Sequence, residues 1–466
     1  MDFLAELRSL VGEAHVLPGG TDPAFEQDWR RRWHGQARAI VRPASTSEVA
    51  QVVSLCAARG VPLVPQGGNT GLVGGGVPDG SGTQVLLSLR RLNRIRAIDS
   101  ANLTLTAEAG CVLQQVQEAA QAQGLMFPLS LAAEGSCTIG GNLATNAGGT
   151  QVLRFGNARD LCLGLEVVTP RGEIWDGLTG LRKDNTGYDL RGLYIGSEGT
   201  LGVITAATLK LWPEPASITT AMAACASLQD CVALLGLARR RLDAALTGFE
   251  VMNGFSLELV ARHFPQISRP LPAVAWTVLL EQSDAQPEDA ARSRIEALLE
   301  EALEIGCIQD ASVAQSLSQS RTMWHLRESI PLAQAEEGLN IKHDISVPVS
   351  AIPEFVERTD AALAARWPGI RFVNFGHLGD GNLHYNVQAP AGADGAAFLR
   401  DHEHAVNGIV YDAVQACSGS ISAEHGVGSL KRDELPLRKS AVALDLMRAV
   451  KAALDPAGLM NPGRVL

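Results

Sequence analysis

Histidine and glutamate side chains gather toward the C-terminal end of the sequence in a pattern suited to metal chemistry. The run G-H-L-G-D-G-N-L-H-Y-N, which begins at Gly376, contains His377 and His384, and a later run, S-A-E-H-G, adds Glu424 and His425. Alternating residues on both sides of the G-D-G turn predict a hairpin that brings the first two histidines side by side. Two histidines and one glutamate form a ligand set for Zn²⁺ or Mn²⁺ with open positions for substrate. The last histidine then remains as a base. A single histidine is more often structural, but this cluster favours a function.

Two glycine-rich stretches in the first third of the chain have the composition of a phosphate-binding wall. The first, 65–71, follows an expected strand at 61–64 and matches neither G-x-G-x-x-G nor a P-loop. Its backbone N–H groups nevertheless suit a pyrophosphate. The second, 135–149, combines small residues with amide and hydroxyl groups that suit a flat heterocycle, and we expect no core helix there. One such loop is often a plain turn, whereas two in one domain-sized stretch favour binding.

Composition limits the classes of function. The chain has 466 residues, 46% of them hydrophobic and 19% charged, which predicts large buried cores. The net charge of −11 argues against nucleic-acid partners and anionic membrane surfaces, so an anionic substrate needs a local basic pocket. The eight cysteines form no C-x-x-C pair and are expected to be reduced and buried. We expect no transmembrane segment and no signal peptide, and therefore a cytoplasmic protein.

The coarse pattern alternates strands and helices. Ser45 and Glu48 predict a capping box for a helix that ends at Gly60. The segment 324–338 is expected to be one helix and 341–347 one strand, and the double proline at 213–215 marks a domain boundary. These patterns predict α+β domains.

The motifs together resemble those of the FAD-dependent D-2-hydroxyacid dehydrogenases of the vanillyl-alcohol-oxidase flavoprotein superfamily. They are P-Q-G-G-N-T-G, G-S-C-T-I-G-G-N-L-A-T-N-A-G-G, R-K-D-N-T-G-Y-D-L, G-S-E-G-T-L-G, G-H-L-G-D-G-N-L-H and A-E-H-G-V-G. The resemblance implies an α+β fold with a two-subdomain FAD-binding domain of the vanillyl-alcohol-oxidase type at 1–213. It also implies an α+β substrate (cap) domain with the metal hairpin at 214–417, and a C-terminal helical segment at 418–466 that returns to the FAD domain.

The resemblance implies FAD as the cofactor and assigns residues to it. These are Gln66, Gly67, Gly68, Asn69, Thr70 and Gly71 around the pyrophosphate; Ser136, Gly140, Gly141, Asn142, Thr145 and Asn146 along the flavin and phosphates; and Gly202, Ile204 and Asn461. Some members of the superfamily bind flavin covalently through a histidine in the first loop. Asn69 stands there in this chain and cannot form that bond, so we expect dissociable FAD.

The resemblance also implies roles at the reaction centre. His377, His384 and Glu424 would hold a divalent metal, usually zinc, with manganese as the alternative, and His425 would be the base. The substrate would be bound by a further set, namely Arg327, Lys342 and Asn386. Without the resemblance, the alternative for Arg327 is a surface ion pair with Glu328 or Glu337. Pro331 stands where 2-hydroxyglutarate enzymes carry a threonine, which loses one polar contact and leaves the identity of the acid in doubt.

The implied reaction is metal-assisted oxidation of a D-2-hydroxy acid, with D-2-hydroxyglutarate as the first candidate and D-malate beside it. The alternatives are a D-lactate dehydrogenase or a glycolate oxidase flavin subunit, a colourless metal-dependent hydrolase, and a non-catalytic flavin-binding subunit. The electron acceptor implied is an electron-transfer flavoprotein or a quinone, and oxygen stays open. A homodimer is one alternative for the oligomeric state.

Overall fold

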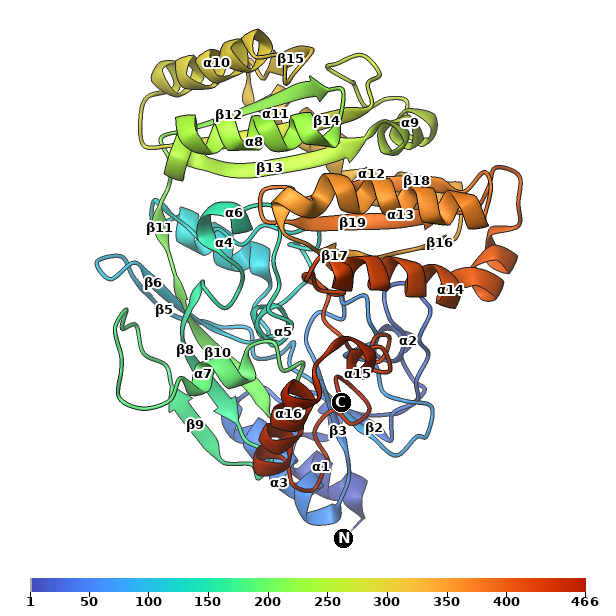
Figure 1. Cartoon of the computed structure of the whole chain (residues 1–466). Helices are drawn as coiled ribbons and strands as arrows, with labels where there is room; N and C mark the ends of the chain where they lie inside the picture. Colours follow the sequence, from blue (N-terminus) through green and yellow to red (C-terminus); the bar gives the residue numbers. More distant parts are fainter. Residues whose placement is uncertain (1) are drawn as a thin grey trace. The chain divides into compact units, whose positions relative to one another are not determined.

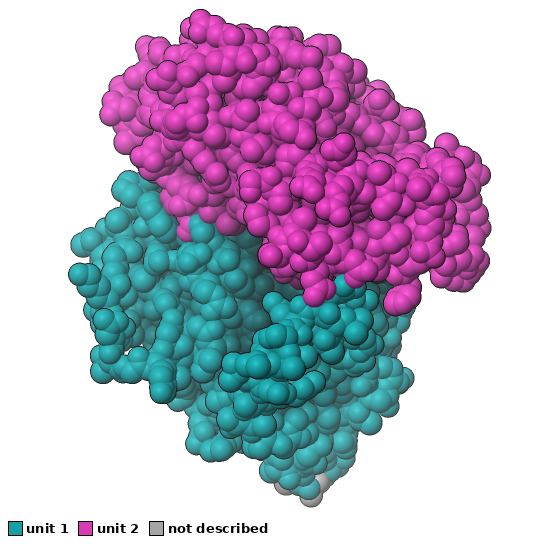
Figure 2. All heavy atoms as spheres, viewed as in Figure 1, with its two compact units in different colours: residues 1–148, 156–214, 424–466 teal, residues 149–155, 215–423 magenta. Residues whose placement is uncertain are grey.

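The computed structural model describes residues 2–466 and divides the chain into two compact units, coloured separately in Figure 2. Unit 1 comprises 1–148, 156–214 and 424–466, and unit 2 comprises 149–155 and 215–423. The sequence analysis places the domain boundaries after residues 213 and 417. The structure instead assigns 418–423 to unit 2 rather than to the C-terminal segment.

Unit 1 contains two main sheets (Figure 1). Its strands are β1 Val16–Pro18, β2 Ala39–Val41, β3 Leu63–Gln66, β4 Val85–Ser88, β5 Ile95–Asp99, β6 Thr104–Glu108, β7 Leu125–Met126, β8 Cys162–Val168, β9 Ile174–Gly177, β10 Val203–Lys210 and β11 Trp212–Pro213. Its helices are α1 Phe3–Val11, η1 Glu13–His15, α2 Pro23–Glu26, α3 Thr46–Arg59, α4 Leu113–Gln121, α5 Ile139–Ala144, α7 Leu190–Tyr194, α15 Leu435–Arg438 and α16 Ala441–Leu454. The strand orders are β1-β2-β4-β3, parallel among the last three, and β5-β6-β10-β8-β9, antiparallel throughout.

Local sequence signals explain how α3 leads into the strand that carries the first glycine loop. The Ser45 hydroxyl accepts a hydrogen bond from the Glu48 amide at 3.2 Å, and the Glu48 carboxylate reaches back to the amide of Ala44 at 2.7 Å. Gly60 ends the helix with φ +61°, a left-handed conformation that glycine adopts without strain. The predicted helix and its predicted cap are therefore confirmed.

The second glycine-rich stretch contains a short helix, and the expectation of no core helix there was wrong. Residues Ile139–Ala144 form α5, and Ile139, Gly140, Asn142 and Leu143 are buried in it. A Cβ built at Gly140 would lie 2.6 Å from the Cβ of Ala109, so only glycine permits this approach. The same small residues that make a poor isolated helix let this one pack closely.

Unit 2 is built on one eight-stranded sheet in the order β15-β12-β14-β13-β18-β19-β16, with β17 also paired to β19. Its strands are β12 Ser217–Cys225, β13 Leu246–Asn253, β14 Trp276–Asp284, β15 Asp310–Val313, β16 Asn340–Ile341, β17 Asp344–Ser346, β18 Arg371–Gly376 and β19 Asn382–Gln388. Its helices are α6 Val152–Phe155, α8 Leu228–Leu242, η2 Asp243–Ala245, α9 Gly254–His263, α10 Glu288–Glu304, α11 Leu317–Glu328, α12 Ile330–Glu337, η3 Val349–Ala351, α13 Ile352–Arg366 and α14 Gly395–Ala416.

Strand alternation divides the side chains of this sheet between its two faces. One face packs against α8, α10, α13 and α14, and the other packs against α9, α11 and α12. Glu250 of β13 and His384 and Asn386 of β19 lie on the second face. Their strand neighbours belong to the core of the first face, namely Phe249, Val251, Leu383, Tyr385 and Val387. The sheet thus presents these polar residues toward the α11 side.

Two predicted elements are each interrupted in the structure. The expected helix 324–338 is two helices, because α11 ends at Glu328 and Pro331 begins α12 at its second position. Proline has no N–H to give to a preceding turn, so it starts a helix more readily than it continues one. The expected strand 341–347 is likewise divided between β16 and β17. Among residues 2–466, no helix has the length and hydropathy needed to cross a membrane.

Asp360 of α13 provides a stability test that is separate from catalysis. Its carboxylate accepts a hydrogen bond from the Tyr385 hydroxyl at 2.5 Å, and burial raises the pKa of Asp360 from 3.8 to about 6. The pKa of Asp360 is higher in the folded than in the unfolded protein. Its protonated form therefore contributes to the free energy of unfolding in full below pH 3.8, and this contribution is lost as the pH rises through about 6. Asn does not titrate, so Asp360→Asn removes this dependence of stability on pH. Its amide oxygen can still accept the hydrogen bond from the Tyr385 hydroxyl.

We therefore expect the stability of Asp360→Asn, relative to the wild type, to increase by about 1 kcal/mol between pH 5 and pH 8. Urea unfolding of both proteins at the two pH values measures this difference. Parallel pH profiles for the two proteins would contradict the burial of a protonated Asp360.

Candidate functional site

A cavity that opens to solvent lies in unit 1, and its empty space together with the solvent at the opening is about 1010 Å³. Both glycine-rich stretches wall it: 65–71 and 73–77 from the first region, and Thr138, 140–142 and 144–145 from the second. Residues 197–199 and 202–204 complete most of the wall, and the His425 side of the A-E-H-G-V-G segment also lines it. The predicted loops are thus brought together around one space.

Glycine is required in this wall because backbones approach closely. A Cβ at Gly68 would lie 2.2 Å from the backbone oxygen of Ser136, and one at Gly67 would lie 2.3 Å from the Thr138 hydroxyl. No real Cβ makes such contacts, so an alanine would push the two stretches apart. The two glycines therefore set the width of the wall.

Buried polar atoms in the wall indicate what the cavity can hold. Gln66 donates from its amide nitrogen to the carbonyls of Phe25 and Gly76, at 2.8 and 2.7 Å. Its amide oxygen and the Thr138 hydroxyl are buried and receive no hydrogen bond among the described residues. Buried polar groups are nearly always satisfied. Unsatisfied atoms beside rows of glycine amides therefore fit a polar ligand that carries phosphates.

His425 is held at this cavity by a carboxylate of unit 1. Both oxygens of Glu198 accept backbone hydrogen bonds, from Val427 and Gly428, each at 2.7 Å. Burial raises the pKa of Glu198, and the two backbone amides partly offset that shift. Glu198 itself has φ +54°, and the Asn461 amide donates to its carbonyl at 2.7 Å. These contacts fix the loop that carries His425.

In unit 2, the buried carboxylate of Glu250 joins two of the predicted site residues. One of its oxygens accepts a hydrogen bond from Arg327 Nε at 2.8 Å, and the other lies 2.6 Å from His377 Nδ1. Burial alone would raise the pKa of Glu250, but His377 and Arg327 outweigh it and lower the pKa to about 2. The Arg327 guanidinium also lies 5.0 Å from the centre of the Phe375 ring. Arg327 is thus paired with Glu250, a residue that the sequence analysis did not consider.

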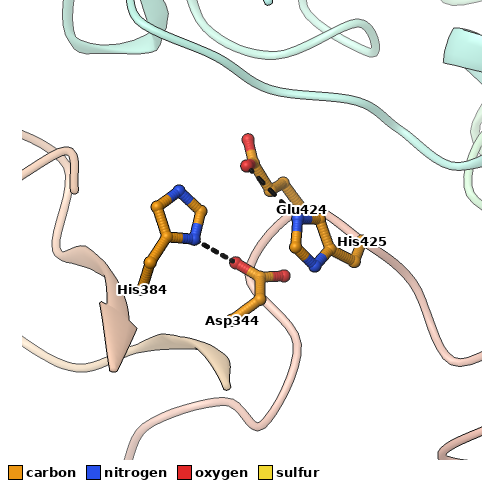
Figure 3. Close-up of side chains that lie close together, drawn as sticks. All are labelled: Asp344, His384, Glu424 and His425. Carbon is orange, nitrogen blue, oxygen red and sulfur yellow. Dashed lines mark ion pairs between the residues drawn. The ribbon is translucent and has the colours of Figure 1, made fainter. Parts of the chain in front are cut away.

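The hairpin of β18 and β19 has the predicted form. Phe375 pairs with His384 across it, and the rings of His377 and His384 lie with their centres 5.6 Å apart. His384 Nδ1 is 4.0 Å from an oxygen of Asp344, which lies opposite it on β17 (Figure 3). The hairpin therefore brings the two histidines together, and the neighbouring strand β17 adds the carboxylate of Asp344.

Asp344 also contacts the last residue of unit 2, because the amide of Ala423 donates to Asp344 Oδ2 at 3.2 Å. Glu424 is the next residue along the chain and begins the last segment of unit 1. Its carboxylate lies 3.7 Å from His425 Nε2, the second pair drawn in Figure 3.

The two remaining predicted substrate residues also belong to unit 2. Asn386 is buried, donates to Gln334 Oε1 at 3.0 Å, and accepts from the backbone amide of His343 at 3.2 Å. Lys342 is half-buried in the short segment between β16 and β17. Their contact with a substrate stays a prediction.

Two family models together match most of this chain. Residues 37–177 match the family model described as an FAD binding domain, and 214–465 match that of FAD linked oxidases, C-terminal domain. The D-2-hydroxyglutarate dehydrogenase of Xanthomonas citri pv. viticola is 40% identical over 451 residues, which is 96% of this chain and 93% of that protein. The chain belongs to the FAD-dependent D-2-hydroxyacid dehydrogenases. The matched FAD binding region lies in unit 1 except for residues 149–155.

The chain is also similar to two further proteins and to one solved structure. The mitochondrial D-2-hydroxyglutarate dehydrogenase of Arabidopsis thaliana is 38% identical over 98% of this chain and 80% of its own. A Schizosaccharomyces pombe protein named as a mitochondrial D-lactate dehydrogenase is 36% identical over 98% and 88%. The solved structure of p-cresol methylhydroxylase with substrate bound has a TM-score of 0.78, at 16% identity and over 99% of this chain and 96% of its own. At that identity it supports the fold alone.

Most residues assigned to FAD line the cavity, whereas three do not: Ser136, Asn146 and Asn461. Asn146 accepts a hydrogen bond from the amide of Arg159, and Asn461 donates to the carbonyls of Gly75 and Glu198, so both support the wall. Sequence reasoning missed Thr138 and Glu198, although both stand inside quoted motifs.

A glycine substitution tests the cavity wall. We expect Gly68→Ala to weaken FAD binding by about tenfold or more, because overpacking of this kind typically costs about 1–3 kcal/mol. Gly80→Ala is the matched control, since a Cβ there meets nothing within 4 Å and Gly80 does not line the cavity. Quenching of flavin fluorescence on titration of the apoprotein gives both affinities. Equal affinities would contradict the tight wall.

Proposed function

We propose that this chain oxidises a D-2-hydroxy acid to the 2-oxo acid with the help of a divalent metal, and that D-2-hydroxyglutarate is the substrate. The observation that carries the proposal is a group of polar residues on one side of the unit 2 sheet. His384 and Asn386 of β19 lie on that face, His377 lies beside His384, and Arg327 of α11 shares the Glu250 carboxylate with His377. The names of full-length relatives support the choice of acid. A cationic clamp beside a histidine pair suits a substrate with carboxylates and a hydroxyl group.

The chemistry of the side chains fits a metal ion. Asp344, His384, Glu424 and His425 each offer one ligand atom, and His377 stands beside His384. Imidazole nitrogens with carboxylate oxygens suit Zn²⁺ first and Mn²⁺ second. We propose His377, His384 and Glu424 as ligands, with Asp344 either completing the set or orienting His384. A bound metal would supply a Lewis acid that lowers the pKa of the substrate hydroxyl.

Each remaining residue has one task in the proposed reaction. Arg327 binds a substrate carboxylate with the donors that Glu250 does not occupy, since a guanidinium has five. Lys342 adds a second positive charge, and Asn386 orients the substrate. His425 removes the hydroxyl proton, a task that suits a neutral imidazole. Bound FAD supplies the acceptor for the hydride that leaves C2.

Two features favour a second candidate substrate. Pro331 starts α12, where it supplies no side-chain donor, and one full-length relative is named as a D-lactate dehydrogenase. A monocarboxylate needs one cationic partner fewer than a dicarboxylate. We therefore keep D-lactate and glycolate as the alternative and an electron-transfer flavoprotein or a quinone as the proposed acceptor.

Anaerobic mixing with a set of acids tests the substrate. The oxidised flavin band is followed with D-2-hydroxyglutarate, D-malate, D-lactate, glycolate and the L-isomers, with and without a chelator. We expect rapid bleaching by D-2-hydroxyglutarate that chelation abolishes. Bleaching by D-lactate or glycolate alone would transfer the proposal to the alternative, and no bleaching by any of them would reject the substrate class.

Two histidine variants separate the base from the metal ligands. We expect His425→Ala to keep its metal while flavin reduction slows by about 10²–10⁴-fold, and His384→Ala to lose metal as well. Elemental analysis after dialysis and stopped-flow reduction measure the two properties. The exposed His404 of α14 provides the control, His404→Ala. Loss of metal from His425→Ala would make His425 a ligand rather than the base.

A further inference from the structure

Glu250 lies at the centre of unit 2 with its two carboxylate oxygens committed to different residues. Oε2 accepts from Arg327 Nε at 2.8 Å and lies 2.8 Å from Arg327 Nη2, whereas Oε1 lies 2.6 Å from His377 Nδ1. The Glu250 side chain is fully buried. A buried carboxylate requires such partners because water cannot solvate it.

We propose that Glu250 is a positioning residue that fixes both the metal-binding nitrogen of His377 and the plane of the Arg327 guanidinium. This inference rests on the proposed function, in which His377 holds the metal and Arg327 holds a substrate carboxylate. One rigid group would then set the distance between metal and carboxylate clamp. That distance decides which acids fit.

Hydrogen-bond chemistry gives the direction of the contact with His377. A carboxylate beside a guanidinium accepts hydrogen bonds and donates none, so the proton of a neutral His377 must lie on Nδ1. The lone pair is then on Nε2, the nitrogen that would face a metal. Metal-binding histidines commonly use a carboxylate in this way to fix their tautomer and ring orientation.

The fold makes this arrangement rigid. Glu250 is in the middle of β13. Val251, the residue after Glu250, pairs with Gly376 of β18, the residue before His377. Gly376 has φ +150°, and a Cβ there would lie 2.8 Å from the carbonyl of Asn382. The Phe375 ring lies beside the Arg327 guanidinium, 5.0 Å away. Backbone pairing thus places the carboxylate before any ligand binds.

A glutamine cannot perform both tasks. If its amide oxygen faces Arg327, its NH₂ group faces Nδ1 of His377 and forces the proton of that ring onto Nε2, where it blocks the metal. If the amide is turned the other way, NH₂ faces N–H groups of Arg327. The variant Glu250→Gln therefore keeps the size of the side chain and removes the double acceptor.

The test measures metal affinity by competition with a chromogenic chelator, in the FAD-loaded protein and without substrate. We expect Glu250→Gln to bind Zn²⁺ about 10–100-fold more weakly than the wild type. Glu281→Gln is the matched control. Glu281 is also buried in the sheet, but it accepts from Trp324 Nε1 at 2.6 Å and Thr220 Oγ1 at 3.0 Å. Because an amide oxygen can accept those bonds, the control should bind metal normally.

A double variant distinguishes positioning from general destabilisation. If Glu250 acts through His377, adding Glu250→Gln to His377→Ala should weaken metal binding no further. Additive losses, or wild-type affinity in Glu250→Gln, would overturn the inference. Should Glu250→Gln fail to fold, Glu250→Asp keeps the charge beside Arg327 and is too short to reach both partners, so its affinity should fall as well. A wild-type protein that binds no metal would instead reject the proposed function.

Discussion

A carboxylate buried inside a sheet is the constraint on which unit 2 depends. Water cannot reach Glu250, so the protein must stabilise its charge: the Arg327 guanidinium carries the opposite charge, and His377 forms a hydrogen bond with the other oxygen. Breaking a buried pair of this kind typically costs about 3–5 kcal/mol. The pair therefore ties α11, β13 and the end of β18 to one geometry. Two of the residues proposed for substrate and metal are thus part of the interior that holds the unit together.

In unit 1 the decisive feature is the lack of side chains at several glycines. At Gly67, Gly68 and Gly140 any Cβ would clash with a neighbouring atom, namely the Thr138 hydroxyl, the Ser136 carbonyl oxygen and the Ala109 Cβ respectively. The result is a wall of backbone amides and buried polar atoms that no packed core would tolerate without a ligand. Stability and cofactor binding are coupled here as well, because the cavity keeps its shape only while these contacts stay close.

Much of both units could be predicted from sequence because the signals are local. The Ser45 cap, the Gly60 terminus and the G-D-G hairpin each depend on residues within a few positions of one another. The break at Ser329 was missed because the residues on both sides of Pro331 favour a helix, so the sequence predicts one continuous helix there. The helix α5 was missed because its glycines are unfavourable in isolation, and only the close contact with Ala109 offsets that cost.

The sequence by itself determined the chemistry: the glycine loops, the histidine hairpin, the A-E-H-G-V-G segment, and through them membership of an FAD-dependent family. Only the tertiary structure decided which residues contact these predicted site residues. Glu250 and Asp344 stand in ordinary strands without a motif, yet one contacts Arg327 and His377 and the other lies opposite His384. Strand pairing joins residues separated by scores of positions. Pairing of this kind depends on the register of the whole sheet, which no short stretch of sequence encodes.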